Sequence, residues 1–88
     1  MPYFIAYLET RDEKKDVEVL EEHKAYLQKY LNEGKIFAKG PFLDHTGGLI
    51  IYKTDTEEEA LEIAKNDPVI REGSRKMIFK AWKSTLSE

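Results

Sequence analysis

The sequence contains no cysteine, and this absence excludes several kinds of site. Without thiols the chain can form no disulfide framework, no thiolate metal centre and no cysteine nucleophile. It also lacks any apolar run near the roughly 18 residues that a membrane-spanning helix needs. The first residues, Met1-Pro2-Tyr3-Phe4, have neither the basic segment nor the long apolar core of a signal peptide. We therefore expect a cytoplasmic protein with no membrane partner.

The chain also has little excess of either charge, with 17 acidic and 14 basic side chains and a net charge of −3. This balance gives no general attraction to the phosphate backbone of a nucleic acid, so we expect no nucleic-acid partner. Its 88 residues contain no linker or low-complexity tract, and they predict one domain over residues 1–88. A domain of this size buries only roughly 60% of its unfolded surface, so a partner subunit would add stability.

Apolar spacing predicts the element order βαββαβ. Strands are expected at residues 3–9, 35–41, 48–53 and 75–83, with a turn at 44–47. The first helix contains His23 and ends at Gly34. The second helix begins at Thr56, which forms a capping-box pattern with Glu59, and cannot easily continue through Asp67-Pro68. This order predicts an α+β fold, in which a four-stranded antiparallel sheet carries two helices on one face.

The first and third predicted strands are apolar on both faces. In the first strand, Tyr3, Ile5 and Tyr7 alternate with side chains that are equally apolar. Both helices cover the same face of the sheet, so the other face is open in a monomer. We expect a second copy to cover that face, which would give a homodimer. The alternative is an aromatic face that stays exposed to water.

His23 falls where an amphipathic helix should carry an apolar side chain. It repeats the three-and-four spacing of Leu20, Leu27, Tyr30 and Leu31. A ring that titrates near pH 7 and points into a core needs a hydrogen-bond partner or a function. His23 is therefore either a core histidine bonded to a carbonyl or hydroxyl group, or part of a functional site.

Asp67 is the second polar residue that falls on an inward position. It continues the spacing of Ala60 and Ala64 at the end of the second helix, which should lie near the first half of the first helix. Ordinary turn chemistry before Pro68 is the alternative explanation. A carboxylate beside an imidazole fixes its tautomer and leaves the other nitrogen free to accept or deliver a proton. His23 and Asp67 are thus candidates for a catalytic acid/base dyad.

Several short motifs carry a family resemblance. They are the aromatic first strand, Glu22-His23-Lys24-Ala25-Tyr26-Leu27, Gly34-Lys35-Ile36, Ala38-Lys39-Gly40-Pro41 and Asn66-Asp67-Pro68. In this order they resemble the YciI-like (YCII-related domain) family over nearly the whole chain. The resemblance implies a ferredoxin-like fold assembled as a dimeric α+β barrel. It also implies an active site built from a histidine and an aspartate, which by motif are His23 and Asp67.

Three further residues are candidates for lining a pocket. Gly40 and Pro41 end a predicted strand, where glycine either lets a ligand approach the backbone or simply permits a bend. Tyr7 either lines a cavity for a flat molecule or packs in a core or interface. The Asp44-His45 pair lacks a recognised spacing of metal ligands and is expected at the surface, so we expect no metal and no cofactor.

These features favour an enzyme-like protein in which His23 and Asp67 act as an acid/base pair on a small organic substrate, a class that includes aromatic molecules. Without a covalent nucleophile, the reaction would be an isomerisation, an elimination or a hydrolysis driven by proton transfer. The alternative is a noncatalytic ligand-binding or accessory module in which the pair is structural. A third hypothesis, a purely structural interaction domain, predicts a filled core without a pocket.

Overall fold

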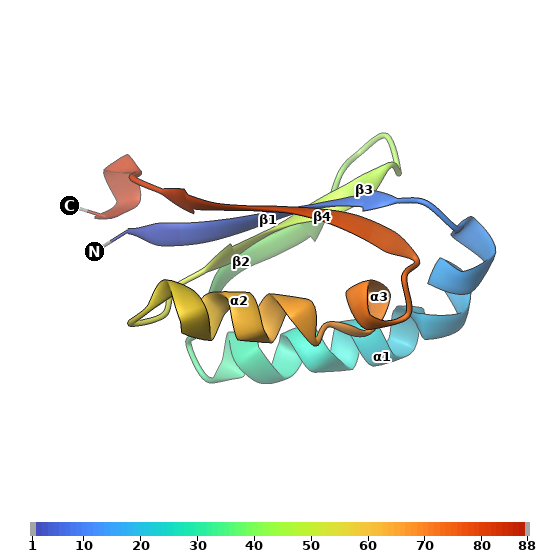
Figure 1. Cartoon of the computed structure of the whole chain (residues 1–88), viewed down its shortest axis with the longest axis horizontal. Helices are drawn as coiled ribbons and strands as arrows, with labels where there is room; N and C mark the ends of the chain where they lie inside the picture. Colours follow the sequence, from blue (N-terminus) through green and yellow to red (C-terminus); the bar gives the residue numbers. More distant parts are fainter. Residues whose placement is uncertain (1, 88) are drawn as a thin grey trace.

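The computed structural model describes residues 2–87 and consists of a four-stranded antiparallel sheet with helices on one face (Figure 1). The strands are β1 (Tyr3–Thr10), β2 (Ile36–Pro41), β3 (Gly47–Tyr52) and β4 (Arg75–Trp82). The helices are α1 (Glu13–Asn32), α2 (Glu57–Lys65) and α3 (Pro68–Arg71), followed after β4 by a 3-10 turn, η1 (Thr85–Ser87). The predicted ferredoxin-like α+β fold is confirmed, with one more short helix than expected.

The additional helix is α3, and it begins directly after Asp67. A residue before proline is disfavoured in the helical conformation, and Asp67 is accordingly extended in its ψ angle of 130°. Proline is well suited to the first position of a helix, since its fixed φ angle matches and its missing amide hydrogen is not needed there. The Asp67-Pro68 pair therefore separates α2 from a new helical turn.

Two local signals in the sequence act as expected at the ends of the long helices. The Thr56 hydroxyl accepts a hydrogen bond from the Glu59 amide at 3.1 Å, which caps the start of α2. Gly34 follows the end of α1 with a φ angle of +79°, a left-handed conformation that glycine adopts at little cost. No helix within residues 2–87 combines the length and apolar character needed to cross a membrane.

The strand order is β2-β3-β1-β4, so β1 and β3 are the central strands. Ala6 of β1 lies opposite Ile50 of β3 and Phe79 of β4, and these three side chains share the face that the helices cover. The core lies between this face and the helices. Its buried members include Phe4, Ala6, Leu8, Val19, Leu27, Ile36, Ile50, Tyr52, Ala60, Ile63, Ala64 and Val69.

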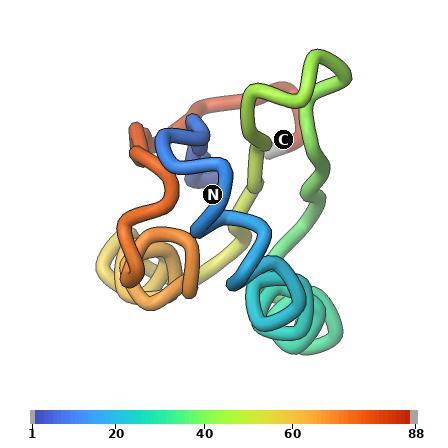
Figure 2. Tube along the Cα trace, turned by 90° about the vertical axis from the view of Figure 1, so that its right-hand side faces the viewer, coloured from blue at the N-terminus to red at the C-terminus, as the bar shows by residue number. Residues whose placement is uncertain are grey.

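The helices α1, α2 and α3 leave the opposite face of the sheet uncovered (Figures 1 and 2). At one end of that face, η1 contacts β1, where the Tyr3 hydroxyl donates to the Leu86 carbonyl at 3.4 Å. Figure 2 shows α1 lying beside the α2 and α3 segment, both on the same side of the strands. The uncovered face, which we call the open face, carries aromatic and aliphatic side chains together with Lys76 and Lys80 of β4, which pair with Glu9 and Ile5 of β1. Large side chains that stay partly exposed there include Tyr7 at 39%, Phe37 at 46%, Ile78 at 47% and Trp82 at 38%.

Candidate active site

His23 lies on the buried face of α1, between Val19 and Leu27. All three side chains face the sheet because residues four apart lie on one side of a helix. Only 7% of His23 is exposed. The imidazole thus occupies a core position, as its spacing in the sequence predicts.

Asp67 is almost fully buried, at 1% exposed, and its Oδ1 atom lies 2.6 Å from His23 Nδ1. The same oxygen accepts a hydrogen bond from the Val69 amide at 3.2 Å. Asp67 therefore caps α3 and contacts the histidine with one atom, so both the turn chemistry and the pairing considered for it are present. Its position differs from the expected one, because α2 ends at Lys65 and Asp67 lies outside both helices.

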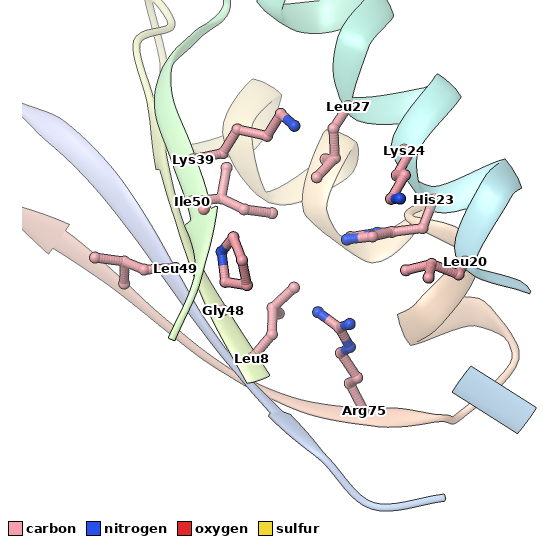
Figure 3. Close-up of a pocket in the computed structure, with 12 residues that line it drawn as sticks. Leu8, Leu20, His23, Lys24, Leu27, Lys39, Gly48, Leu49, Ile50 and Arg75 are labelled. Atoms are coloured by element: carbon pink, nitrogen blue, oxygen red, sulfur yellow. The ribbon is translucent and has the colours of Figure 1, made fainter. Parts of the chain in front are cut away.

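The contact with Asp67 determines which nitrogen of the His23 ring carries a hydrogen. A carboxylate oxygen can only accept, so Nδ1 carries the hydrogen of this bond. The Nε2 atom is then the ring atom that can exchange a proton with another molecule. Figure 3 shows the His23 ring reaching from α1 into a cavity between the helix and the sheet.

Tyr52 adds a second buried polar group near the pair. Its side chain is fully buried, and no hydrogen-bond partner lies near its hydroxyl or near Asp67 Oδ2 among residues 2–87. Burial raises the pKa of the Tyr52 phenol well above its ordinary value, and the negative charge of Asp67 raises it further. The phenol therefore stays protonated at neutral pH.

The cavity beside His23 has a volume of about 130 Å³. This is close to the roughly 150 Å³ that accommodates benzene in a protein core. Gly40 and Pro41, both predicted as pocket residues, line it. A cavity of this size suits a molecule with a single ring.

Tyr7, the third predicted pocket residue, does not line this cavity. Because side chains alternate along a strand, Ala6 and Leu8 face the helices and Tyr7 faces the other way. Its ring instead packs on Phe42, with the ring centroids 5.1 Å apart on the open face. Tyr7 therefore packs on the open face and is not a residue of this cavity.

Three residues near the cavity were not singled out from the sequence: Asp16, Lys39 and Arg75. Arg75 Nε and Nη2 donate to the two carboxylate oxygens of Asp16 at 2.8 and 2.9 Å. The Ser74 hydroxyl donates to Asp16 as well, at 2.8 Å. Asp16 precedes His23 by seven residues and so lies on the same side of α1, which is the one signal for it in the sequence.

The Asp16 carboxylate is held in its charged form by these contacts. Burial alone would raise the pKa of Asp16, but the hydrogen bonds from Arg75 and Ser74 outweigh that effect and lower it below the ordinary value. The charge of the nearby His23 ring acts in the same direction. Asp16 thus fixes the orientation of the Arg75 guanidinium at the cavity wall.

The Asp44-His45 pair lies in the turn between β2 and β3, and His45 is exposed. Asp44 accepts hydrogen bonds from the Thr46 hydroxyl and amide, which lower the pKa of its carboxyl. Residues 2–87 contain no cluster of three or more side chains placed to hold a metal ion. Through its two bonds to Thr46, the Asp44 side chain stabilises the turn.

Comparison with known proteins identifies the family. The model of the YCII-related domain matches residues 1–83. The chain belongs to this family. The resemblance stated from the sequence motifs is thereby confirmed.

Two proteins illustrate the similarity. The uncharacterised protein YjpA of Bacillus subtilis (strain 168) is 36% identical over 81 residues, which are 92% of this chain and 95% of YjpA. A solved structure of 5-chloro-2-hydroxyhydroquinone dehydrochlorinase (TftG) from Burkholderia phenoliruptrix AC1100, in complex with 2,5-dihydroxybenzoquinone, superposes with a TM-score of 0.80. It is 24% identical, with 98% of both chains covered, and this similarity shows a shared fold.

Proposed function

We propose that this YCII-related protein is an enzyme that moves a proton on a small organic molecule bound in the cavity beside His23. The observation that carries the proposal is the position of the His23 ring, which contacts Asp67 through Nδ1 and lines the cavity. In this proposal His23 accepts and delivers the proton through Nε2. Asp67 orients the ring and balances its charge.

The residues around the cavity favour proton transfer over covalent catalysis. No residue that lines it carries a hydroxyl or thiol group. A positioned general acid or base typically contributes about 10² to 10⁴-fold to a rate, so binding must supply the rest. Isomerisation, elimination and hydrolysis are the reaction types that such a site supports. Because the dehydrochlorinase TftG has a similar fold, 5-chloro-2-hydroxyhydroquinone is a sensible first compound to assay.

The test is a turnover assay with 5-chloro-2-hydroxyhydroquinone first, followed by other hydroxylated or halogenated one-ring compounds. We expect turnover by the unsubstituted protein and a loss of about 100-fold or more in kcat in His23→Ala and Asp67→Asn. Circular dichroism and thermal melting verify that both variants are folded. Unchanged kcat in a folded His23→Ala variant would contradict the proposal, as would the absence of turnover across the series.

A noncatalytic ligand-binding module is the second candidate, and the double use of Asp67 Oδ1 favours it. An atom that caps α3 and holds His23 has a structural role whether or not a reaction takes place. Ligand binding without turnover that survives both substitutions would support this candidate. The purely structural hypothesis predicted a filled core, and the cavity of about 130 Å³ speaks against it.

We further propose that two copies of the chain pair through the open face. The support is the set of large apolar side chains exposed there, among them Phe37, Ile78 and Trp82. Several large apolar side chains exposed on one face are typical of an interface, and Lys80 lies between Ile78 and Trp82 on this one. Size-exclusion chromatography with light scattering should give the mass of a dimer, and a monomer at micromolar concentration would exclude this pairing. The cytoplasmic location expected from the sequence stays a prediction.

A further inference from the structure

Among residues 2–87, the side chains that line the cavity beside His23 include basic ones and no acidic one. The basic members are His23, Lys24, Lys39 and Arg75, and the other eight of the 12 lining residues are apolar side chains or glycines. The chain as a whole carries a net charge of −3, so this concentration of positive charge is local. A cavity with one sign of charge and apolar walls concentrates ligands of the opposite sign.

Arg75 is the rigid member of this group. Its side chain is 11% exposed and that of Asp16 is 13% exposed, and two parallel hydrogen bonds hold the guanidinium in place. Asp16 offsets the formal charge of Arg75, yet the Nη1 atom makes no hydrogen bond within residues 2–87. A guanidinium held on one edge can present its other donors to an anion.

Lys39 reaches the cavity because β2 contains an irregularity between Ile36 and Ala38. Ile36 and Lys39 lie opposite Tyr52 and Ile50 of β3, so both side chains turn toward the helices. In a regular strand, residues three apart would face opposite sides. The extra residue therefore turns a lysine inward at the edge of the sheet (Figure 3).

Neither lysine of the cavity has an acidic partner in the described part of the chain. No carboxylate lies within 4.0 Å of the ammonium group of Lys24 or Lys39. Because Asp16 neutralises Arg75, the net positive charge of the cavity lies on Lys24 and Lys39. Between them, Leu8, Leu27 and Ile50 form an apolar floor.

We infer that the cavity binds a small, flat organic anion whose ring lies on the apolar floor and whose charged group lies between Arg75 and Lys39. This inference names the substrate class of the proposed enzyme and rests on that proposal for its relevance to catalysis. An ionised oxygen of the ligand, bound between Arg75 and Lys39, would share the cavity with the His23 ring. Arg75 and Lys39 would then bind the negative charge of the ligand, while His23 Nε2 accepts or delivers the proton.

Matched probes of equal shape can test the charge preference. Benzoate is an anion and benzamide is its uncharged counterpart, so their dissociation constants can be compared by calorimetry or by NMR titration. We expect benzoate to bind about tenfold or more tightly than benzamide, and to weaken as salt is added. Equal affinity for the two compounds, or no binding of benzoate at millimolar concentration, would overturn the inference.

Two lysine variants test where in the cavity the anion binds. Lys39→Gln should weaken benzoate severalfold and leave benzamide unchanged, because Lys39 is exposed and its substitution does not disturb the core. Lys14→Gln is the control, since Lys14 lies on α1 and does not line the cavity. Equal effects of the two substitutions on benzoate would reject the assigned position of the anion.

These measurements separate the two proposals. Benzoate binding requires no turnover, so a charge preference combined with full activity of His23→Ala would refute the acid/base role alone. Turnover that depends on His23, without preference for benzoate, would refute the anion site alone.

Discussion

Tyr52 and Tyr26 are neighbouring tyrosines of the core whose hydroxyl groups differ in their bonding. Tyr26 donates a hydrogen bond to the Ile63 carbonyl at 2.7 Å, while no partner lies near the Tyr52 hydroxyl among residues 2–87. Burial raises the pKa of both phenols above the ordinary value. A buried hydroxyl group without a partner costs free energy that a bonded one recovers.

The two tyrosines therefore predict opposite effects of removing a hydroxyl group. Tyr52→Phe should leave the free energy of unfolding unchanged or raise it by up to about 1 kcal/mol. Tyr26→Phe should lower it by about 1 kcal/mol, because the Ile63 carbonyl loses its donor. Urea denaturation of both variants gives the comparison. A Tyr52→Phe variant that loses as much stability as Tyr26→Phe would show that the Tyr52 hydroxyl is bonded after all.

At the scale of elements, regular periodicity made most of the fold predictable from the sequence. The three-and-four spacing around His23 predicted α1, and alternation predicted four strands whose ends lie within one residue of the observed ones. The four-residue helix α3 is too short to show a period and was not predicted. The inward turn of Lys39 was missed for a related reason, because nothing in the alternation of β2 reveals its irregularity.

The residues of the candidate site were predictable only where the pattern of a single helix or turn made a polar side chain stand out. His23 stood out on an apolar helical face, and Asp67 stood out before a proline. Arg75 and Lys39 occur in strands where a charged residue is unremarkable. Only the pairing of β4 with β1 and of β2 with β3 brings them to the same cavity, and that pairing is a property of the folded chain.

The Asp16 and Arg75 pair joins α1 to β4, and it predicts how stability changes with pH. Because the pKa of Asp16 is lower in the folded chain than its ordinary value of 3.8, the unfolded chain binds the proton more readily. The stabilisation is complete above that ordinary value. It is lost as the pH falls through the lowered pKa of the folded chain.

Asp16→Asn should therefore lower the free energy of unfolding by about 2 kcal/mol at pH 7, and the difference from the unsubstituted protein should shrink below pH 4. Urea denaturation at pH 7 and pH 3 measures both values. Asp55→Asn is a suitable control, since Asp55 is exposed between β3 and α2. A difference that stays constant over this range would show that the charge of Asp16 is not its source.

At the scale of the whole molecule, the sheet separates two surfaces with different chemistry. The helix-covered face carries the cavity with its basic side chains, and the open face carries exposed aromatic and aliphatic side chains beside Lys76 and Lys80. The proposed pairing of two copies would use the second surface and leave the first available to a ligand. Ligand binding and self-association would then be separable by substitution.

Ile78→Glu tests this separation, because Ile78 is 47% exposed on the open face. In the proposed dimer, the new carboxylate would be buried against apolar side chains of the second copy without a partner. We therefore expect the dissociation constant of the dimer to increase by about 100-fold or more. Val17→Glu places the same charge at a residue of α1 that is 73% exposed, and it should leave the mass unchanged. Light scattering across a dilution series reports the result. A dimer that persists equally in both variants would assign pairing to another surface.

The irregularity in β2 has a consequence for how relatives of this chain can diverge. The extra residue turns Lys39 toward the helices and at the same time leaves Phe37 on the open face, where its ring contacts Tyr3 at a centroid distance of 5.3 Å. Deleting one residue there would turn Lys39 to the open face, and the cavity would keep Lys24 and Arg75 but lose the cation that β2 supplies. A single deletion in an edge strand would thus alter ligand choice and self-association together, and relatives with a regular β2 should differ from this chain in both.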